Sequence, residues 1–364
     1  MERSLLKELN KKNISAFVNR ARDTYLKQMF WPLFFSLKYT TQLTWESLSG
    51  SSGAPVMADV VEYNSSAPLK TRRTISKAHG DIPKIAIKRR MDEKDFNEYL
   101  NMRALASGDM NKSAILDIVF NDVDFAYTGV LARTEFLCLQ ALSYGSLSLT
   151  ASNNNGIITE TAVDFGIPAA NKTAVGTIWA TAASATPLAD IQSVVDTAEE
   201  DGRTIETIIM DKATFNKMAA CTEVKDAFAL FQRISGSRKS TPTLGDVNTM
   251  LESMLLPRIM VVNSAVRFES GDHALSSVKP WKTGYVSFIP TMKIGEMKHG
   301  PIAEENSEAV KKNALMVKKD HVLITKFSEI EPFAEFTKGQ ANAFPVFSDV
   351  DGVFILKTDG TSWS

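Results

Sequence analysis

The sequence predicts an α+β fold that combines one very long helix, an extended β ribbon and a compact α/β domain. Residues 111–143 carry apolar side chains every three to four positions without a proline, which predicts a helix of about 50 Å at about 1.5 Å per residue. Two alternating stretches, residues 56–63 and 82–90, predict the paired strands of the ribbon. Helix and strand patterns then alternate over residues 185–295, as in a compact α/β domain.

The N-terminal part predicts a helix followed by an aromatic segment. Residues 1–28 have apolar side chains at three-to-four spacing and charges between them, so this helix could pack on its own chain or dock on a neighbour. Residues 29–47 are dense in aromatic side chains, and Pro32 excludes a regular helix interior there. Such side chains must be buried in a core or in a subunit interface. The aromatic contact residues that we expect are Phe30, Trp31, Phe34, Phe35 and Trp45.

The ribbon follows a Gly- and Ser-rich hinge at residues 48–55. It has too few apolar residues to form its own core, so it needs a surface to lie on, in this chain or in the next. The basic residues that we expect to contact a neighbouring subunit are Lys70, Arg72, Arg73, Lys77, Lys84, Lys88, Arg89 and Arg90.

Charge is unevenly spread along the chain. The whole sequence has a net charge of −1, but residues 1–103 contain 18 Lys and Arg against 11 Asp and Glu, a net charge of +7. The remaining residues contain 23 and 31, a net charge of −8. A basic arm and an acidic body can attract each other between copies of one chain. A solvated basic face without a partner is the alternative interpretation.

The long helix has a plausible N-cap in Asn111 and a plausible stop in Gly145, and a turn at residues 152–156 then predicts a hairpin. In the α/β domain, Pro187 opens one helix and Asp211 caps a second. The further elements expected there are helices at 224–234 and 244–255 and strands at 205–210, 259–262 and 285–289. The C-terminal part predicts strands at 321–327, 344–347 and 353–356.

Composition and motifs argue against several functional classes. The longest apolar run, residues 29–37, is far shorter than the roughly 20 residues of a transmembrane helix, and residues 1–28 are too charged for a signal peptide. Two cysteines, Cys138 and Cys221, cannot form a disulfide framework or a zinc site, and they indicate a reducing compartment. The sequence lacks the glycine-rich nucleotide loops, the nucleophile elbow, the zinc fingers and the RNA-recognition signatures. We therefore expect neither catalysis nor a cofactor.

Metal binding is also not expected. The four histidines lie far apart in the sequence and lack the spacing of a metal motif. Residues 349–352, Asp-Val-Asp-Gly, match part of a calcium loop or a phosphoryl-transfer motif. A calcium loop requires a glutamate at its twelfth position, where Gly360 stands, so a tight hairpin turn is favoured.

In this order the elements resemble the major capsid proteins of tailed bacteriophages. The likeness is to the lambda-type major capsid protein E family, which has the Hong Kong 97-type fold, and it covers nearly the whole chain. The stretches that carry it are Trp31-Pro32-Leu33-Phe34-Phe35, residues 82–96, Ala162-Val163-Asp164-Phe165-Gly166 with Trp179, residues 209–215, and Phe288-Ile289-Pro290.

The resemblance implies a structural protein whose copies form hexamers and pentamers of an icosahedral shell around phage DNA. The implied parts are an N-terminal arm (1–49), an extended loop (50–93), a peripheral domain with spine helix and hairpin (94–184), an axial domain (185–295) and return strands of the peripheral domain (296–364). The extended loop would lie across a neighbouring subunit.

The implied partners are other copies of the chain, a portal and double-stranded DNA, which it would contact only weakly and without sequence specificity. A separate scaffold protein is expected because no long scaffolding segment precedes the fold. Decoration proteins are a further candidate, and no membrane partner is expected. The protein would reside in the virion after assembly in the host cytoplasm.

Three alternatives stay open at this point. An encapsulin-like nanocompartment shell would share the fold and enclose a cargo enzyme. An enzyme would use residues 185–295 and would need a pocket with converging polar groups. A monomeric nucleic-acid binder would act through the basic residues 70–90 and would show a steep dependence on salt.

Overall fold

The computed structural model of the chain describes residues 10–49, 57–58, 76–105, 109–150, 153–154, 161–232 and 240–363. Helices and sheets are mixed, as the predicted α+β class requires. The chain divides into two compact units, each built from three separate segments. The first unit contains residues 1–45, 80–137 and 296–345, and the second contains residues 46–79, 138–295 and 346–364.

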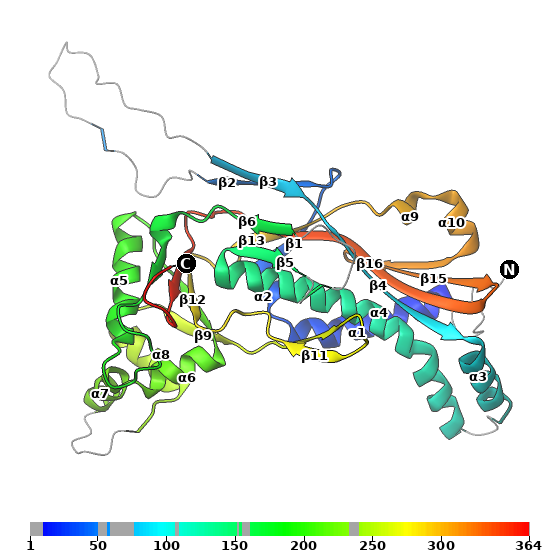
Figure 1. The fold of residues 1–364 in the computed structure, drawn as a ribbon, viewed down its shortest axis with the longest axis horizontal. Helices are drawn as coiled ribbons and strands as arrows, with labels where there is room; N and C mark the ends of the chain where they lie inside the picture. The colour runs from blue at the N-terminus through cyan, green and yellow to red at the C-terminus, as the bar shows by residue number, and fades with distance from the viewer. Residues whose placement is uncertain are drawn as a thin grey trace, which may run out of the picture. The chain divides into compact units, whose positions relative to one another are not determined.

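The first unit is centred on a six-stranded sheet (Figure 1). Its main path runs β1 (Phe35–Tyr39), β13 (Gly295–His299), β16 (Phe333–Phe347), β15 (Val322–Ile330) and β14 (Leu315–Lys319). Strand β4 (Lys84–Asp92) pairs antiparallel with β16, from Lys84 opposite Asn342 to Asp92 opposite Ala334. The predicted strand at 82–90 therefore lies on a sheet of its own chain, one of the two options that the sequence left open.

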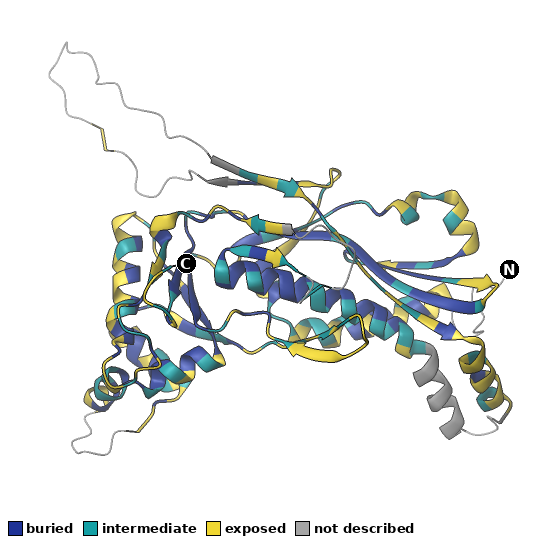
Figure 2. Cartoon of the chain, in the orientation of Figure 1, coloured by how far each residue is buried: buried dark blue, intermediate teal, exposed yellow. Residues whose placement is uncertain are grey.

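The spine helix α4 (Asp109–Tyr144) covers one face of this sheet. The prediction of a long helix over 111–143 is confirmed, and Gly145 follows its end with φ of 73°, a left-handed value that suits glycine. Asn111 lies inside the helix and not at its cap, because the helix already includes Asp109. Figure 2 shows that the described part of α4 is largely buried or half-buried.

Helix α1 (Lys11–Tyr25) and the short 3-10 helix η1 (Leu26–Gln28) pack on their own chain. Ile14, Val18 and Ala21 are the buried side chains of α1. Arg22 Nε donates to Asp320 Oδ2 at 2.5 Å, beside β14. Of the two arrangements considered for the N-terminal helix, the described residues adopt the one within the chain, and residues 1–9 lie outside the described part.

The described part of the first unit also contains the short helix α2 (Trp31–Phe34) and three other helices. Helix α3 (Glu93–Leu105) is not among the predicted elements, and Tyr99 is its one clearly buried large side chain in the part that the structure describes. Figure 2 shows its mostly exposed surface, which explains the weak apolar periodicity. Helices α9 (Ala303–Asn306) and α10 (Glu308–Asn313) lie on the sheet face opposite α4.

The second unit contains a five-stranded sheet in the order β7 (Lys172–Ala174), β17 (Phe354–Lys357), β12 (Tyr285–Ile289), β8 (Thr207–Asp211) and β9 (Arg258–Val262). The 3-10 helix η2 (Ala169–Asn171) precedes β7. The helices around its core are α5 (Pro187–Glu200), α6 (Lys212–Ala220), α7 (Thr222–Phe231) and α8 (Leu244–Ser253). This agrees with the α/β pattern predicted for 185–295.

Local predictions in the second unit agree with the structure. Pro187 stands in the first turn of α5, and Asp211 caps α6 by accepting from the N–H groups of Ala213 and Thr214. The last strand differs from expectation, because β17 pairs with β12 in this sheet and does not return to the six-stranded one. Its apolar residues Phe354, Ile355 and Leu356 are all buried there, which gives the physical reason.

Three two-stranded pairs complete the described elements: β2 (Thr44–Ser49) with β3 (Ser76–Asp81), β5 (Ser146–Leu149) with β6 (Thr161–Asp164), and β10 (Val266–Glu269) with β11 (Leu275–Val278). The predicted strand at 56–63 and most of the predicted turn at 152–156 lie outside the described residues. Asp349, in the Asp-Val-Asp-Gly stretch, forms an ion pair of 2.6 Å with Arg203, so its carboxylate serves the packing of the second unit.

Candidate assembly surface

Strand β4 carries four of the eight predicted basic contact residues, and its pleat divides them between the two faces of the sheet. Arg89 turns toward α4, where its guanidinium lies 3.9 Å from the ring centre of Phe125 and its Nη1 lies 3.3 Å from Asp122 Oδ1. Arg89 is therefore engaged within its own chain. The residues on the opposite, exposed face are Lys84, Lys88 and Arg90.

The other four predicted basic residues cannot be placed with this strand. Lys77 belongs to β3, but its side chain is outside the described part of the chain, as are Lys70, Arg72 and Arg73 altogether. The contact of these eight residues with a neighbouring subunit therefore stays a prediction.

The aromatic segment lies in the core of the first unit. Trp31, Phe34, Phe35 and Trp45 are buried, and Phe30 is half-buried. Trp45 stacks on Phe344 of β16 with ring centres 5.3 Å apart. Of the two options for these side chains, core or subunit interface, the structure shows the core for all four buried rings.

Glu135 of α4 fixes the start of this aromatic segment. Its carboxylate accepts from the backbone N–H of Phe30 at 3.1 Å and from that of Trp31 at 2.8 Å. Phe30 precedes the short helix α2 (Trp31–Phe34), and Trp31 begins it. The carboxylate therefore accepts from two backbone donors that have no partner within the helix. The buried glutamate was not identified from the sequence, where it reads as one polar position in a helix.

Glu304 joins α9 to the outer face of the sheet. Lys338 Nζ donates to its Oε1 at 2.6 Å, Lys84 Nζ lies 3.4 Å from the same atom, and Gln340 donates to Oε2. Burial alone would raise the pKa of Glu304, but the bonds from Lys338 and Gln340 lower it to about 2. The carboxylate therefore stays ionised and holds strands β4 and β16 to the helix that covers them.

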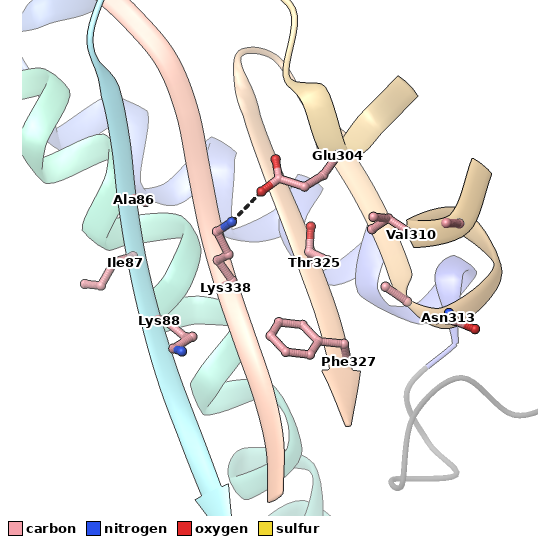
Figure 3. Close-up of a pocket in the computed structure, with 11 residues that line it drawn as sticks. Ala86, Ile87, Lys88, Glu304, Val310, Asn313, Thr325, Phe327 and Lys338 are labelled. Atoms are coloured by element: carbon pink, nitrogen blue, oxygen red, sulfur yellow. Dashed lines mark hydrogen bonds and ion pairs between the residues drawn. The ribbon is translucent and has the colours of Figure 1, made fainter. Parts of the chain in front are cut away.

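A groove lies beside this carboxylate, between strands β4 and β15 and helix α10 (Figure 3). Its volume is about 630 Å³, within the range of roughly 300–1,000 Å³ that is usual for ligand pockets. Its apolar lining includes Ala86, Val310 and Phe327, and Lys88 and Lys338 add positive charge. The sequence did not indicate this groove, because its walls come from separate segments of the chain.

The buried His321 and the half-buried His299 form a polar cluster elsewhere in the first unit. The rings of His299 and His321 lie 6.2 Å apart, and His321 Nε2 is 3.3 Å from Thr134 Oγ1. Burial lowers the pKa of both histidines, to about 4 for His321, and the nearby Lys318 lowers that of His299 further. Both rings are therefore neutral at pH 7. Their wide separation in the sequence gave no signal of a pair.

The described residues provide no obvious catalytic or metal centre. They contain no group of three or more His, Cys, Asp or Glu side chains arranged to hold a metal ion. Within the same part of the chain, no helix combines the length and apolarity needed to cross a membrane.

Comparison with known families decides the assignment. The sequence profile of the family described as phage major capsid protein E matches residues 12–358. The chain belongs to the phage major capsid protein E family. It is a capsid shell protein, which favours the phage capsid over the encapsulin-like shell among the alternatives that the sequence left open.

Solved structures support the fold of this capsid protein. A protein assigned as the capsid protein of a prophage of E. coli CFT073 is similar with a TM-score of 0.59 and 15% identity, covering 96% of this chain and 99% of that one. A phage-related protein from Bordetella bronchiseptica RB50 is similar with a TM-score of 0.50 and 12% identity, covering 95% and 97%. No curated protein sequence matches the chain. The Hong Kong 97-type fold expected from the resemblance is confirmed.

Proposed function

We propose that copies of this capsid protein assemble through pentamers and hexamers into an icosahedral head that encloses phage DNA. The observation that carries the proposal is the family match, which extends over residues 12–358 and therefore over both units. In this proposal the role of the chain is structural and involves no catalysis.

The two units take different places in the proposed shell. The first unit, with the spine helix and six-stranded sheet, acts as the peripheral domain, and residues 185–295 of the second unit act as the axial domain around the capsomer centre. The extended loop (50–93) reaches a neighbouring subunit with the residues that precede β4, because β4 (Lys84–Asp92) pairs with β16 of its own chain. The exposed side chain of Lys88 on β4 supports this role, because it offers positive charge to the predominantly acidic remainder of a neighbour. The nearby Lys84 and Arg90 are already paired within the chain, with Glu304 at 3.4 Å and with Asp92 at 2.5 Å.

The proposed partners are a separate scaffold protein, a portal, decoration proteins and packaged double-stranded DNA. A net charge of −1 supports only weak, sequence-independent contact with DNA, because strong binding requires many neutralised phosphates. The protein is then a virion component that assembles in the host cytoplasm.

Electron microscopy of the purified protein tests this proposal. We expect rings of five or six, tubes or closed shells in negative stain, with a matching particle mass by light scattering. The assay is run with and without the proposed scaffold protein. Nuclease-protected DNA inside shells from infected cells would support the phage head, whereas a single enclosed enzyme would support the nanocompartment. A chain that stays monomeric with its scaffold present would contradict the proposal.

A further inference from the structure

The β15–β16 hairpin ends in an exposed apolar side chain between two carboxylates. Ile330 is 91% exposed, and its sequence neighbours Glu329 and Glu331 are exposed as well. Ile330 pairs with Phe333 in the last step of the strand ladder, so its backbone is fixed by the sheet. A rigid tip of this kind loses little conformational entropy when it binds.

The groove on the same sheet has complementary chemistry. Its lining is mostly apolar and includes the side chains of Lys88 and Lys338 (Figure 3). Glu304 is engaged by Lys84 and Lys338, so three lysines face one carboxylate around this groove and leave a net positive charge. An apolar side chain flanked by carboxylates suits such a surface.

Thr325 adds an independent sign that the groove receives a ligand. It lines the groove, is only 4% exposed, and its Oγ1 makes no hydrogen bond to any described residue. A buried hydroxyl without a partner is costly, because it has lost its water and gained nothing. An incoming backbone or carboxylate group would provide the missing bond.

The tip of a chain cannot fill the groove of the same chain. Thr325 and Phe327 are odd-numbered residues of β15 and face the groove, whereas Ile330 is even-numbered and lies on the other face of the ladder. This β15–β16 tip can therefore enter only the groove of another molecule, and the proposed shell brings further copies of this same chain into contact.

We propose that the β15–β16 tip of one copy inserts Ile330 into the groove of a second copy, with Glu329 and Glu331 beside Lys88 and Lys338. The inference rests on the proposed assembly and names one of its contacts. Each copy gives a tip and receives another, so two copies either exchange tips about a two-fold axis or pass them head to tail in a ring or along the shell.

Cysteine pairing tests the geometry of this contact. One chain carries Ile330→Cys and another carries Val310→Cys, and the two are co-assembled, so a disulfide between the introduced thiols can only join two copies. The native Cys138 and Cys221 are buried and do not compete. We expect a cross-linked dimer on non-reducing gels after mild oxidation of the particles. The control pair of Ile330→Cys with Leu275→Cys, on β11 of the second unit, should give none.

Substitution tests the energy of the contact. Ile330→Asp should raise the protein concentration needed for assembly by about tenfold or more, because an apolar anchor is lost and a third negative charge is added. Leu275→Asp, at a side chain that is 64% exposed on another hairpin, should leave that concentration unchanged. Thermal unfolding of the unassembled proteins checks that both variants fold.

The two proposals fail in different ways. Normal assembly of Ile330→Asp, or particles in which the Ile330→Cys and Val310→Cys chains form no cross-link, would overturn the tip-in-groove contact and leave the capsid function standing. Failure of the unsubstituted chain to form particles with its scaffold would overturn both.

Discussion

Gly339 marks a close approach between strand β16 and the spine helix α4. A Cβ atom at this position would overlap the backbone carbonyl of Ala126, and neither backbone can move without disturbing sheet or helix hydrogen bonds. We expect Gly339→Ala to lower the free energy of unfolding by about 1–3 kcal/mol, measured by urea denaturation of the unassembled protein. Gly176→Ala is the matched control, because no atom lies within 4 Å of its added Cβ. Equal effects of the two substitutions would contradict this account.

The buried ring of His321 makes the free energy of unfolding depend on pH in one direction. The pKa of His321 is lowered to about 4 in the folded chain, chiefly by burial and next by His299, against an ordinary value of 6.5. Between these values the unfolded chain binds a proton that the folded chain excludes. The free energy of unfolding therefore falls as pH drops from 6.5 to about 4, by roughly 3 kcal/mol for a group shifted this far.

Urea denaturation across this pH range measures the effect. His321→Leu should flatten the dependence, whereas His273→Gln, at an exposed histidine, should preserve it. Two charged groups near His299 and His321 also act on their pKa values. Asp320 raises the pKa of both histidines, and Lys318 lowers the pKa of His299. Glu304 affects the pH dependence of stability at lower pH. Its pKa is about 2 in the folded chain, so the stabilisation from its carboxylate is lost only as the pH falls below about 4.5. An unchanged slope in His321→Leu would refute the assignment.

Among the elements, the N-terminal aromatic segment depends on a single carboxylate of the spine helix. Glu135 accepts from the N–H groups of Phe30 and Trp31, and its side chain is buried. Glu135→Gln keeps the shape but removes the charge and replaces one acceptor oxygen with a donor. We expect a loss of about 1–3 kcal/mol in the free energy of unfolding and faster hydrogen exchange at these two amides. Glu98→Gln, at an exposed position of α3, should change neither.

Elements were predictable where one face is apolar and the period is unbroken. Helix α5 has that pattern, and Asp211 marks the start of α6 by its capping chemistry. Helix α4 was predictable because apolar side chains recur along it without a proline. Strand β16 was predicted only over 344–347 although it begins at Phe333. Its earlier part contains Glu335, which is fully buried in an ion pair of 3.2 Å with Lys326, and buried charges read as solvent-facing in a sequence.

The candidate surface was harder to predict than the elements. The basic residues of β4 are visible in the sequence, but the division that turns Arg89 inward depends on the register with β16. The groove combines β4, β15, β16 and the α9–α10 segment, and β4 is separated from the others by most of the chain. No local pattern carries that information, since it arises only when the sheet forms.

For the whole molecule, charge distribution links the fold to assembly. The first 103 residues have a net charge of +7, and the remainder has a net charge of −8. In a single chain these charges nearly cancel, so they do little for solubility. Between copies they favour contacts of the basic part of one chain with the acidic part of another, at a strength that falls as salt rises.

The basic charge is concentrated in the extended loop (50–93). Reversing the charge there tests whether charge attraction between copies is needed for particle assembly. We expect Arg72→Glu with Arg73→Glu to abolish assembly, or to raise the required protein concentration at least about tenfold, while the unassembled chain keeps its melting temperature. Two repulsive charges then replace two attractive ones at a contact between copies. Lys11→Glu with Lys12→Glu is the matched control, because it makes the same change in net charge within the first turn of α1, where exposed carboxylates are tolerated. Light scattering at low and high salt measures both variants, and residual attraction should weaken as salt rises. Normal shells from the loop variant would show that these arginines make no contact that assembly requires, and equal failure of the control would assign the effect to net charge alone.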